Sequence, residues 1–302
     1  MKALLWKKHY QTENFNIMEK KYLPFVQNLI ELAIAEDIGD GDHTSLSTIP
    51  SDKRGRMKLL VKQDGIIAGV EIAEMVFQRL DPTVKFEKLI DDGTPVRVGD
   101  IVFYVEGRVI TLLQAERLVL NIMQRMSGVA TQTAEYVKLI EGTGATLIDT
   151  RKTTPGMRVL DKMAVKIGGG GNHRMGLFDM ILLKDNHIDF SGGVYNAVMK
   201  AKEYLKKTGK NLPIEVEVRN LDDIDEVFRA GGADRIMLDN FTPELSREAV
   251  AKIAGRAEIE SSGGITKANL RDYAETGVDF ISVGALTHQI KSLDLSLKAI
   301  DF

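Results

Sequence analysis

The sequence predicts an α+β module followed by an α/β barrel, and three observations lead to this fold class. Short β-type runs surround a single helix between residues 56 and 106, whereas β runs alternate with helical patterns after Gly144. Such alternation implies βαβ units and a parallel sheet. The last four β runs begin at residues 214, 235, 258 and 280, in steps of about 22 residues that suit a compact strand-loop-helix-loop repeat. Steps this short favour a barrel.

Composition narrows the class of protein and of partner. The 302 residues, 44% hydrophobic and 27% charged, exclude a disordered, collagen-like or coiled-coil chain and allow two modest domains or one larger barrel. A net charge of -3 at pH 7 argues against a nucleic-acid-binding protein, so we expect small-molecule partners. The absence of cysteine excludes disulfides, thiolate metal sites and a cysteine nucleophile.

No segment of the sequence has the pattern of an export signal or a membrane helix. The N-terminal apolar run, residues 3–6, is too short for the core of a signal peptide. No stretch approaches the roughly 20 apolar residues that a membrane helix requires. We therefore expect a cytoplasmic protein without a membrane partner.

The first module is expected to begin with a helix, because apolar residues recur at helical spacing from Leu23 to Glu36. A polar run over residues 37–45 breaks this pattern and predicts a loop. Three β runs separated by Gly and Pro turns follow, and one helix lies between the first two of them: strands 57–61, 84–86 and 101–105, and helix 71–80.

Two amphipathic helices come next, over residues 112–126 and 129–140, with a weak break at Ser127-Gly128. We place the domain boundary at this break, so that the first domain takes residues 1–127 and the barrel takes residues 128–288. The predicted barrel strands are 146–149, 180–183, 214–218, 235–239, 258–261 and 280–283. No G-x-G-x-x-G opens a helix after the first of them, which argues against a Rossmann sheet.

Polar residues gather where the predicted barrel strands end, which is where the active sites of barrels lie. They are Asp149–Thr153, Lys184–His187, Glu217, Asp239, Asn240, Ser261–Gly264 and Gly284. The last two groups predict a phosphate site, because their glycines would expose backbone N–H groups to an anion. In the alternative interpretation these glycines only form tight turns.

Positive charge is concentrated between Arg151 and His187, where seven Lys or Arg stand against three Asp in a chain of negative total charge. Guanidinium groups bind carboxylates bidentately, so this excess suits a ligand with several carboxylates or phosphates. Three of the cations are spaced as one solvated helix face: Arg158, Lys162 and Lys166. The other four lie in loops or at strand ends and are the candidate ligand-binding cations: Arg151, Lys152, Arg174 and Lys184.

Four consecutive glycines, residues 168–171, precede Asn172-His173-Arg174. Such a run is costly in a helix or a strand, and it indicates a flexible lid or a backbone that approaches a ligand closely. A plain linker is the alternative, which the polar triplet that follows makes less favourable.

Two carboxylates, Glu217 and Asp239, end successive predicted strands and can together hold Mg²⁺ or sugar hydroxyls. Either can instead act as a general base or pair with Lys184. A lysine at this place in a barrel is also typical of Schiff-base aldolases, but the neighbouring cations favour anion binding by Lys184.

Many of these runs resemble the quinolinate phosphoribosyltransferase family. The resemblance is carried by Asp149–Gly156, Lys166–Arg174 and Leu182–His187. It extends, in the family's order, to Glu36–Ser45, Glu116–Asn121, Ser127–Thr131, Glu215–Glu217, Met237–Asn240, Glu260–Gly264 and Val283–His288. It covers the chain from about Pro24 to the C-terminus, and the joint order of the motifs is more specific than any one of them.

The resemblance implies an architecture and an assembly. The first domain would be an α/β sandwich to which the C-terminal tail, residues 289–302, returns, and the second would be an open, TIM-like α/β barrel. The family also implies a homodimer in which the sandwich of one subunit closes the barrel of the other.

The resemblance further implies a Mg²⁺-dependent glycosyltransferase of NAD biosynthesis. An enzyme of this family transfers the phosphoribosyl group of phosphoribosyl pyrophosphate (PRPP) to quinolinate with decarboxylation. The products are nicotinate mononucleotide, pyrophosphate and CO₂.

Carried over by motif, the family's site residues fall into two overlapping groups. Quinolinate would be bound by Arg117, which reaches into the other subunit's site, and by Arg151, His173, Arg174 and Lys184. PRPP would be held by Lys152, Glu217, Asp239, Ser262, Gly263, Gly284 and His288, with Glu217 and Asp239 also holding the metal. Among these residues, the catalytic ones would be Lys152, Lys184, Glu217 and Asp239.

Three other functions compete with this interpretation. A transferase of the same fold could take another acceptor such as nicotinate, although three arginines suit a dicarboxylate better. A phosphosugar aldolase or isomerase could use Lys184 as its nucleophile. A regulatory paralogue could bind quinolinate without turnover, although it would have little need for every charged motif position.

Overall fold

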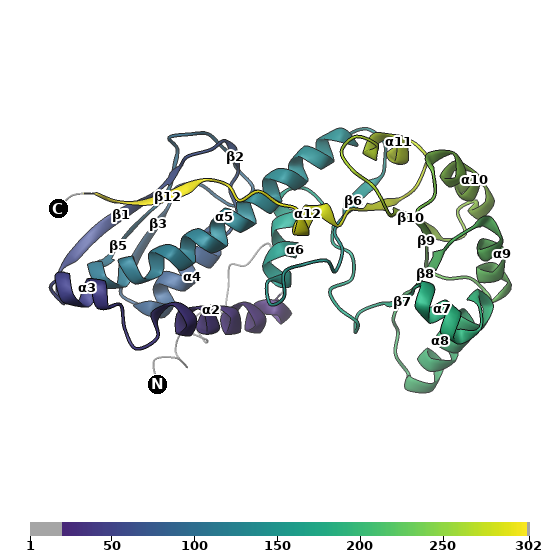
Figure 1. The fold of residues 1–302 in the computed structure, drawn as a ribbon, viewed down its shortest axis with the longest axis horizontal. Coiled ribbons are helices and arrows are strands. Elements are labelled where there is room, and N and C mark those ends of the chain that lie inside the picture. The colour runs from purple at the N-terminus through teal and green to yellow at the C-terminus, as the bar shows by residue number, and fades with distance from the viewer. Residues whose placement is uncertain (1–19, 301–302) are drawn as a thin grey trace. The chain divides into compact units, whose positions relative to one another are not determined.

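The computed structural model describes residues 20–300, which divide into two compact units (Figure 1). Among these residues, the first unit takes the chain up to Ala134 together with Thr153–Gly169 and the segment from Gln289. The second unit takes Glu135–Lys152 and Gly170–His288. Residues 3–6, which entered the prediction about an export signal, lie outside the described part of the chain.

The first unit is built on a four-stranded antiparallel sheet in the order β12-β1-β5-β3. Its strands are β1 (Arg54–Val61), β3 (Lys85–Lys88), β5 (Ile101–Arg108) and β12 (Leu295–Ile300), and a small second sheet pairs β2 (Gly65–Ile66) with β4 (Pro95–Val96). Every second residue of β1 is buried, starting at Met57, so one face of the sheet belongs to the core. Because β12 pairs with β1 along its whole length, Leu295–Ile300 forms an edge strand of this sheet.

Several helices belong to the same unit as this sheet, and an aromatic cluster joins one of them to it. They are the 3₁₀ turn η1 (Lys20–Tyr22), α2 (Leu23–Ile38), α3 (His43–Thr48), α4 (Val70–Leu80) and α6 (Arg158–Ile167). Phe77 of α4 meets Phe103 of β5 edge to face, with ring centroids 6.3 Å apart, and Phe86 lies 4.5 Å from Phe103. This mixed arrangement of helices and sheet is the α/β sandwich expected for the N-terminal part.

The polar run at residues 37–45 contains the start of a helix that the sequence pattern did not predict. Asp42 caps α3, because its carboxylate accepts a hydrogen bond from the Ser45 N–H at 3.1 Å. Since α3 has only six residues, it shows no apolar period from which it could be predicted.

A single helix, α5 (Val109–Leu139, 31 residues), replaces the two helices predicted on either side of Ser127-Gly128. The predicted break was wrong because both residues serve packing. Ser127 Oγ accepts a hydrogen bond from the Ala68 N–H at 2.9 Å. A Cβ on Gly128 would lie 2.4 Å from the carbonyl oxygen of Lys291, so glycine here lets the C-terminal segment pass close to the helix. The predicted domain boundary, 127/128, therefore lies inside α5.

The prediction that α6 exposes Arg158, Lys162 and Lys166 to solvent is also wrong for the middle residue, Lys162. Lys162 is only 1% exposed, whereas Lys166 is exposed and Arg158 is intermediate. The adjacent Asp161 is fully buried and receives two hydrogen bonds from Arg125, at 2.8 and 2.9 Å. A buried charge requires such pairing, so α6 turns charged residues toward the interior of the first unit.

The second unit is a six-stranded parallel sheet in the order β6-β11-β10-β9-β8-β7. Its strands are β6 (Thr146–Ile148), β7 (Ile181–Leu183), β8 (Ile214–Val218), β9 (Arg235–Asp239), β10 (Glu258–Ser262) and β11 (Phe280–Ser282). All six coincide with predicted strands to within one residue at each end. The sheet is curved and barrel-like, with β6 and β7 as its two edges, which confirms the predicted open α/β barrel.

Helices that connect the strands lie along the outer side of this sheet in Figure 1. They are α7 (Asp185–Ser191), α8 (Val194–Thr208), α9 (Leu221–Arg229), α10 (Pro243–Ile253) and α11 (Leu270–Ala274), and the short α12 (Ala285–His288) follows the last strand. Their order follows the strand-helix alternation of the sequence, so the carboxyl ends of the strands meet at one edge of the curved sheet. Within residues 20–300, no helix is long and apolar enough to cross a membrane.

Candidate functional site

A pocket of about 300 Å³ lies at the carboxyl ends of the barrel strands in the second unit. Its walls consist of Thr150, Arg151, Lys152, His173, Arg174, Leu182, Lys184, Met237, Glu260, Ser262 and Ser282. Six of these are predicted site residues: Arg151, Lys152, His173, Arg174, Lys184 and Ser262. The carboxyl ends of the strands therefore bring these six predicted residues, which lie up to about 110 positions apart in the sequence, to one pocket.

Four cations line this pocket from different segments of the unit: Arg151, Lys152, Arg174 and Lys184. Arg174 is buried, and its Nη1 donates to the Met180 carbonyl at 3.1 Å. Burial and the charge of Arg151 lower the pKa of Arg174, although the carboxylates of Glu215 and Asp179 act in the opposite direction. Lys184 Nζ lies 3.4 Å from Glu217 Oε2 at the end of β8. Such a pocket suits a ligand with more than one carboxylate or phosphate.

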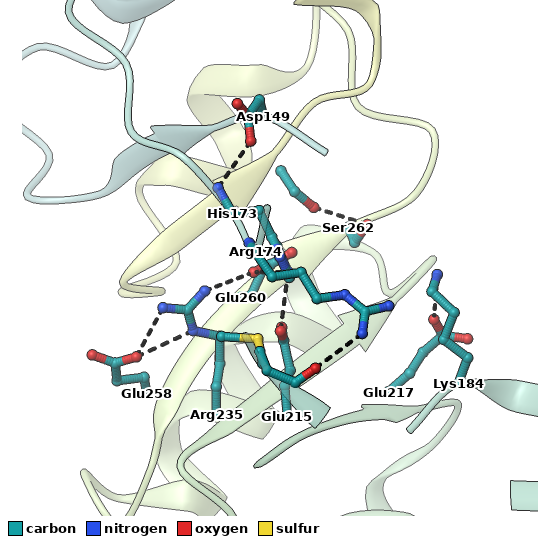
Figure 2. Close-up of polar contacts among 12 residues, drawn as sticks. Asp149, His173, Arg174, Lys184, Glu215, Glu217, Arg235, Glu258, Glu260 and Ser262 are labelled. Atoms are coloured by element: carbon teal, nitrogen blue, oxygen red, sulfur yellow. Dashed lines mark hydrogen bonds and ion pairs between the residues drawn. The ribbon is translucent and has the colours of Figure 1, made fainter. Parts of the chain in front are cut away.

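A buried carboxylate, Asp149, organises the segment that carries two of the pocket residues. It accepts a hydrogen bond from the His173 N–H at 2.9 Å (Figure 2) and another from Asn172 Nδ2 at 2.8 Å. Just before them, the Gly171 N–H donates to Leu147 O at 2.8 Å, and a Cβ on Gly171 would come within 3.0 Å of Ile148. Glycine at this position lets the main chain lie against β6. The close approach predicted for the glycine run is therefore, at Gly171, an approach to a strand of the same unit.

Lys152, Gly284 and His288 form a second group at the mouth. A Cβ on Gly284 would lie 3.0 Å from both Lys152 Cδ and His288 Nε2, so glycine lets the two side chains converge there. Thr287 Oγ1 donates to the Lys152 carbonyl at 2.9 Å and ties α12 to the segment after β6. Side chains that carry positive charge or donate hydrogen bonds, beside a glycine whose main chain a ligand can approach, are typical of a phosphate site.

The third group lies at the ends of β9 and β10. Gly263 has a φ of +92°, and a Cβ on it would lie 2.2 Å from Asn240 Oδ1, so no larger residue fits. The Asn240 N–H donates to the Ser262 carbonyl at 2.9 Å, and Ser262 Oγ accepts from Ser282 Oγ at 3.0 Å. These contacts bring Ser262, Gly263 and the end of β9 together as the motifs implied.

The two carboxylates proposed for a metal lie at the ends of the neighbouring strands β8 and β9. Glu217 is buried and accepts from the Asp185 N–H at 3.3 Å in addition to facing Lys184. Asp239 is less buried and accepts from Asn240 Nδ2 at 2.8 Å. Mg²⁺ is commonly bound by one or two carboxylates together with substrate phosphates and water, so this donor set fits Mg²⁺ that binds with a phosphorylated substrate.

Sequence reasoning missed an acidic pair at the pocket, Glu215 and Glu260 (Figure 2). Both are fully buried, and Glu260 belongs to the pocket wall. Burial and the nearby Glu215 raise the pKa of Glu260 to about 7, and burial also raises the pKa of Glu215. Arg235 Nη1 lies 3.2 Å from Glu260. Strand periodicity could have revealed the pair, since each glutamate precedes a predicted site residue by two positions and so faces the same side.

One predicted site residue lies in the other unit. Arg117 is on the exposed side of α5. An exposed arginine is free to meet another molecule, but its own unit contains none of the other predicted site residues.

Family models match most of the chain. The model for the quinolinate phosphoribosyl transferase C-terminal domain matches residues 129–298, and the model for the N-terminal domain matches residues 42–127. The two matches meet within α5 and together extend from the α3 region to β12.

Curated and solved proteins agree with these models. Quinolinate phosphoribosyltransferase [decarboxylating] 1b of Nicotiana tabacum is 45% identical over 288 residues, covering 90% of this chain and 82% of that protein. A probable nicotinate-nucleotide pyrophosphorylase [carboxylating] of Bacillus subtilis is 40% identical over 272 residues, covering 90% and 92%. The nicotinate-nucleotide pyrophosphorylase structure from Francisella tularensis has a TM-score of 0.84 at 40% identity, covering 92% and 96% of the two chains. NadC from Streptococcus pyogenes has a TM-score of 0.87 at 35% identity, covering 96% and 100%.

Proposed function

The chain belongs to the quinolinate phosphoribosyltransferase family, and we propose that it transfers the phosphoribosyl group of PRPP to quinolinate, giving nicotinate mononucleotide, pyrophosphate and CO₂. This is a pentosyltransferase reaction of NAD biosynthesis. The observation that carries the proposal is the convergence of Arg151, Arg174 and Lys184 on one pocket next to the glycine-containing mouth. That charge suits a dicarboxylate acceptor beside a phosphorylated donor better than it suits a monocarboxylate such as nicotinate.

In the proposed reaction the acceptor is held by its two carboxylates. Arg151 and Arg174 bind them, and Lys184 lies at the side nearest Glu217. Fixing the acceptor in this way places its ring nitrogen toward the ribose and removes much of the entropic cost of bringing two substrates together.

Bond exchange occurs at C1 of the ribose. The bond from C1 to the pyrophosphate oxygen breaks and its electron pair leaves with pyrophosphate, while the lone pair of the quinolinate nitrogen forms the new bond to C1. Positive charge develops at C1, and the carboxylates of Glu217 and Asp239 stabilise it from the ribose side. Lys152 and His288 balance the charge of the phosphate groups at Gly284.

Decarboxylation completes the reaction. The bond between the ring carbon next to the nitrogen and its carboxylate breaks, and its electron pair stays on the ring carbon, where the positively charged ring nitrogen stabilises it. A proton from water then occupies that carbon. Fixed charges perform this chemistry, and the aldolase alternative, which requires a covalent adduct on Lys184, does not fit the family to which the chain belongs.

We propose Mg²⁺ as the metal, held by Glu217 and Asp239 together with substrate oxygens. When bound, Mg²⁺ would neutralise the charge on the leaving pyrophosphate. The carboxylates would orient the ribose and the metal at the same time, which is consistent with their place at neighbouring strand ends.

The first prediction concerns the reaction itself. The purified protein should form nicotinate mononucleotide from quinolinate and PRPP in the presence of Mg²⁺, and chelation with EDTA should lower the rate by at least about 100-fold. Chromatography of the product and a coupled pyrophosphate assay give the two readouts. Nicotinate as acceptor should give little product, and no product from quinolinate with Mg²⁺ would overturn the assignment.

We also propose a homodimer in which Arg117 completes the partner's quinolinate site. The support is the family membership, together with the exposure of this residue on α5. The location in the cytoplasm stays a prediction, since curated relatives include proteins named chloroplastic and mitochondrial.

Hybrid dimers test the role of Arg117. Arg117→Ala and Lys184→Ala proteins should each be nearly inactive alone, because each site lacks one of the cations for the acceptor. After mixing and subunit exchange, about a quarter of the sites should be intact, so activity should recover to a similar fraction. The control mixes two Lys184→Ala preparations with different tags. Exchange without recovery would show that Arg117 does not act across the interface.

A further inference from the structure

The two nitrogens of the His173 imidazole face different groups: Nδ1 takes part in a hydrogen bond, and Nε2 lies close to two buried carboxylates. Nδ1 accepts a hydrogen bond from the Arg174 N–H at 2.6 Å, so a lone pair and not a proton occupies Nδ1. The ring proton is then on Nε2, which lies 3.0 Å from Glu215 Oε2 and 3.5 Å from Glu260 Oε2 (Figure 2). The tautomer follows from this network of contacts.

Arg174 is held at both of its ends by the same network. Its backbone N–H is fixed by the His173 ring, and its guanidinium is fixed by the Met180 carbonyl. A shift of the ring would therefore move the main chain that carries the guanidinium. Misplacement of a binding group by about 1 Å can cost as much as 100-fold in rate, so this support matters for a pocket that binds a small rigid acid.

Burial strengthens the link between the ring and the acids below it. Glu215 and Glu260 are fully buried, and the His173 side chain is 5% exposed. The acids need positive partners at this depth, and they find them in Arg235, Arg174 and the polar edge of the imidazole. The two buried acids thus support the cationic side chains of the pocket from the buried side.

From these contacts we propose that Glu215 is a positioning residue, which holds the Nε2 edge of His173 so that His173 fixes Arg174 for the acceptor carboxylate. The proposal rests on the proposed function and changes one part of the role implied for His173. The imidazole lies between Glu215 and Arg174 and mainly positions Arg174. It contributes to acceptor binding through that arginine.

The same three residues, His173, Glu215 and Glu260, also have the side-chain types of a metal site, with candidate ligand atoms within 4.8 Å of one another. A metal would need the lone pair of Nε2, which the tautomer gives to a proton. Two arginines already supply positive charge near these carboxylates. Positioning therefore explains the cluster better than metal binding does.

Kinetics of two substitutions at Glu215 test the proposal. Glu215→Met has a similar volume but no acceptor for Nε2, and it should raise the KM for quinolinate by about 10- to 100-fold while the KM for PRPP stays within about twofold. Glu215→Gln keeps an acceptor oxygen, so its KM for quinolinate should stay within about threefold of the parent protein. Equal losses for both substrates, or no difference between the Met and Gln variants, would overturn the proposal.

The matched control is Glu258→Gln. Glu258 belongs to β10 and contacts the same Arg235, at 2.9 Å, but its side chain is 55% exposed, whereas the side chain of His173 is 5% exposed. This control removes one negative charge next to Arg235 and leaves the contact between Glu215 and His173 intact, so both KM values should stay unchanged. A rise in the KM for quinolinate here would mean that charge, and not the hold on His173, is what Glu215 contributes.

NMR tests the contact without any substrate. The chain has five histidines, so ¹⁵N-histidine labelling gives a simple spectrum in which His173 is the signal lost in His173→Gln. We expect the Nε2–H tautomer in the parent protein and in Glu215→Gln. An Nδ1–H tautomer, or a shift of this signal on addition of Zn²⁺ or Mn²⁺, would overturn the proposal even if Glu215→Met fails to fold. Because no turnover is needed, this result is independent of whether the proposed reaction is correct.

Discussion

Replacing Lys184 with methionine should lower kcat/KM for quinolinate by about 100- to 1,000-fold, which is the effect of removing one preorganised charge from a polar active site. The Nζ of Lys184 lies 3.4 Å from Glu217 and on the wall of the pocket, so the substitution removes a contact to the acceptor and unbalances a buried carboxylate. The lysine side chain is itself 47% exposed, so the cost in stability comes mainly from Glu217, which is 8% exposed and loses a positive neighbour. Steady-state kinetics and a thermal melt measure the two effects separately.

The control for this substitution is Lys200→Met on α8. Lys200 is exposed and donates to the Ser191 carbonyl at 3.2 Å, and it does not line the pocket. The Lys200→Met substitution removes the same charge from the same unit as Lys184→Met does, and kcat/KM should stay within about twofold of the parent protein. Similar losses in both variants would attribute the effect to net charge. A Lys184→Met protein with nearly full activity would remove this residue from the proposed machinery.

The barrel was largely predictable because its strands are short, buried and separated by regular helices. β8 and β9 coincide with the predicted ranges, since Ile214–Val218 alternates β-branched apolar residues with Glu and Arg235–Asp239 has an apolar centre, and polar turns bound both runs. Knowing the strands places their carboxyl ends, and this is why Lys184, Glu217 and Ser262 could be grouped at one mouth from the sequence.

The packing of charged residues was less predictable. The spacing of Arg158, Lys162 and Lys166 describes one face of a helix, but it does not tell which side of that helix packs against the protein. Lys162 is buried because α6 lies in the interior of the first unit, with Asp161 paired to Arg125. Tertiary contacts of this kind connect residues far apart in the sequence, and a local pattern carries no information about them.

The break in α5 shows the opposite error. Ser-Gly weakens a helix when it is considered alone, and the local pattern therefore predicts two helices. In the folded chain Ser127 bonds to Ala68 and Gly128 makes room for Lys291, and this packing outweighs the weak helix propensity of the two residues. Small residues inside a long helix are here a sign of close packing.

The second large effect is expected at Asp149, which lies next to the predicted cations but received no role from the sequence. Asp149→Ala should lower kcat/KM by at least about 100-fold, because the main chain of His173 and the side chain of Asn172 lose their common acceptor and the support of Arg174 loosens. It should also destabilise the second unit by about 2–4 kcal/mol, since buried donors are left without this partner. Asp149 itself is fully buried.

Amide hydrogen exchange locates this effect. In Asp149→Ala, residues 171–174 should exchange faster while β8 and β9 keep their protection, because local opening precedes global unfolding. Asp149→Asn should give a smaller loss, since its amide oxygen can still accept from the His173 N–H while its amide nitrogen meets the donor of Asn172. The control is Glu248→Ala on the exposed side of α10, which should change neither activity nor exchange at residues 171–174. Uniform acceleration across the second unit would mean that Asp149 supports the fold in general, and the specific link from Asp149 through His173 to Arg174 would then be wrong.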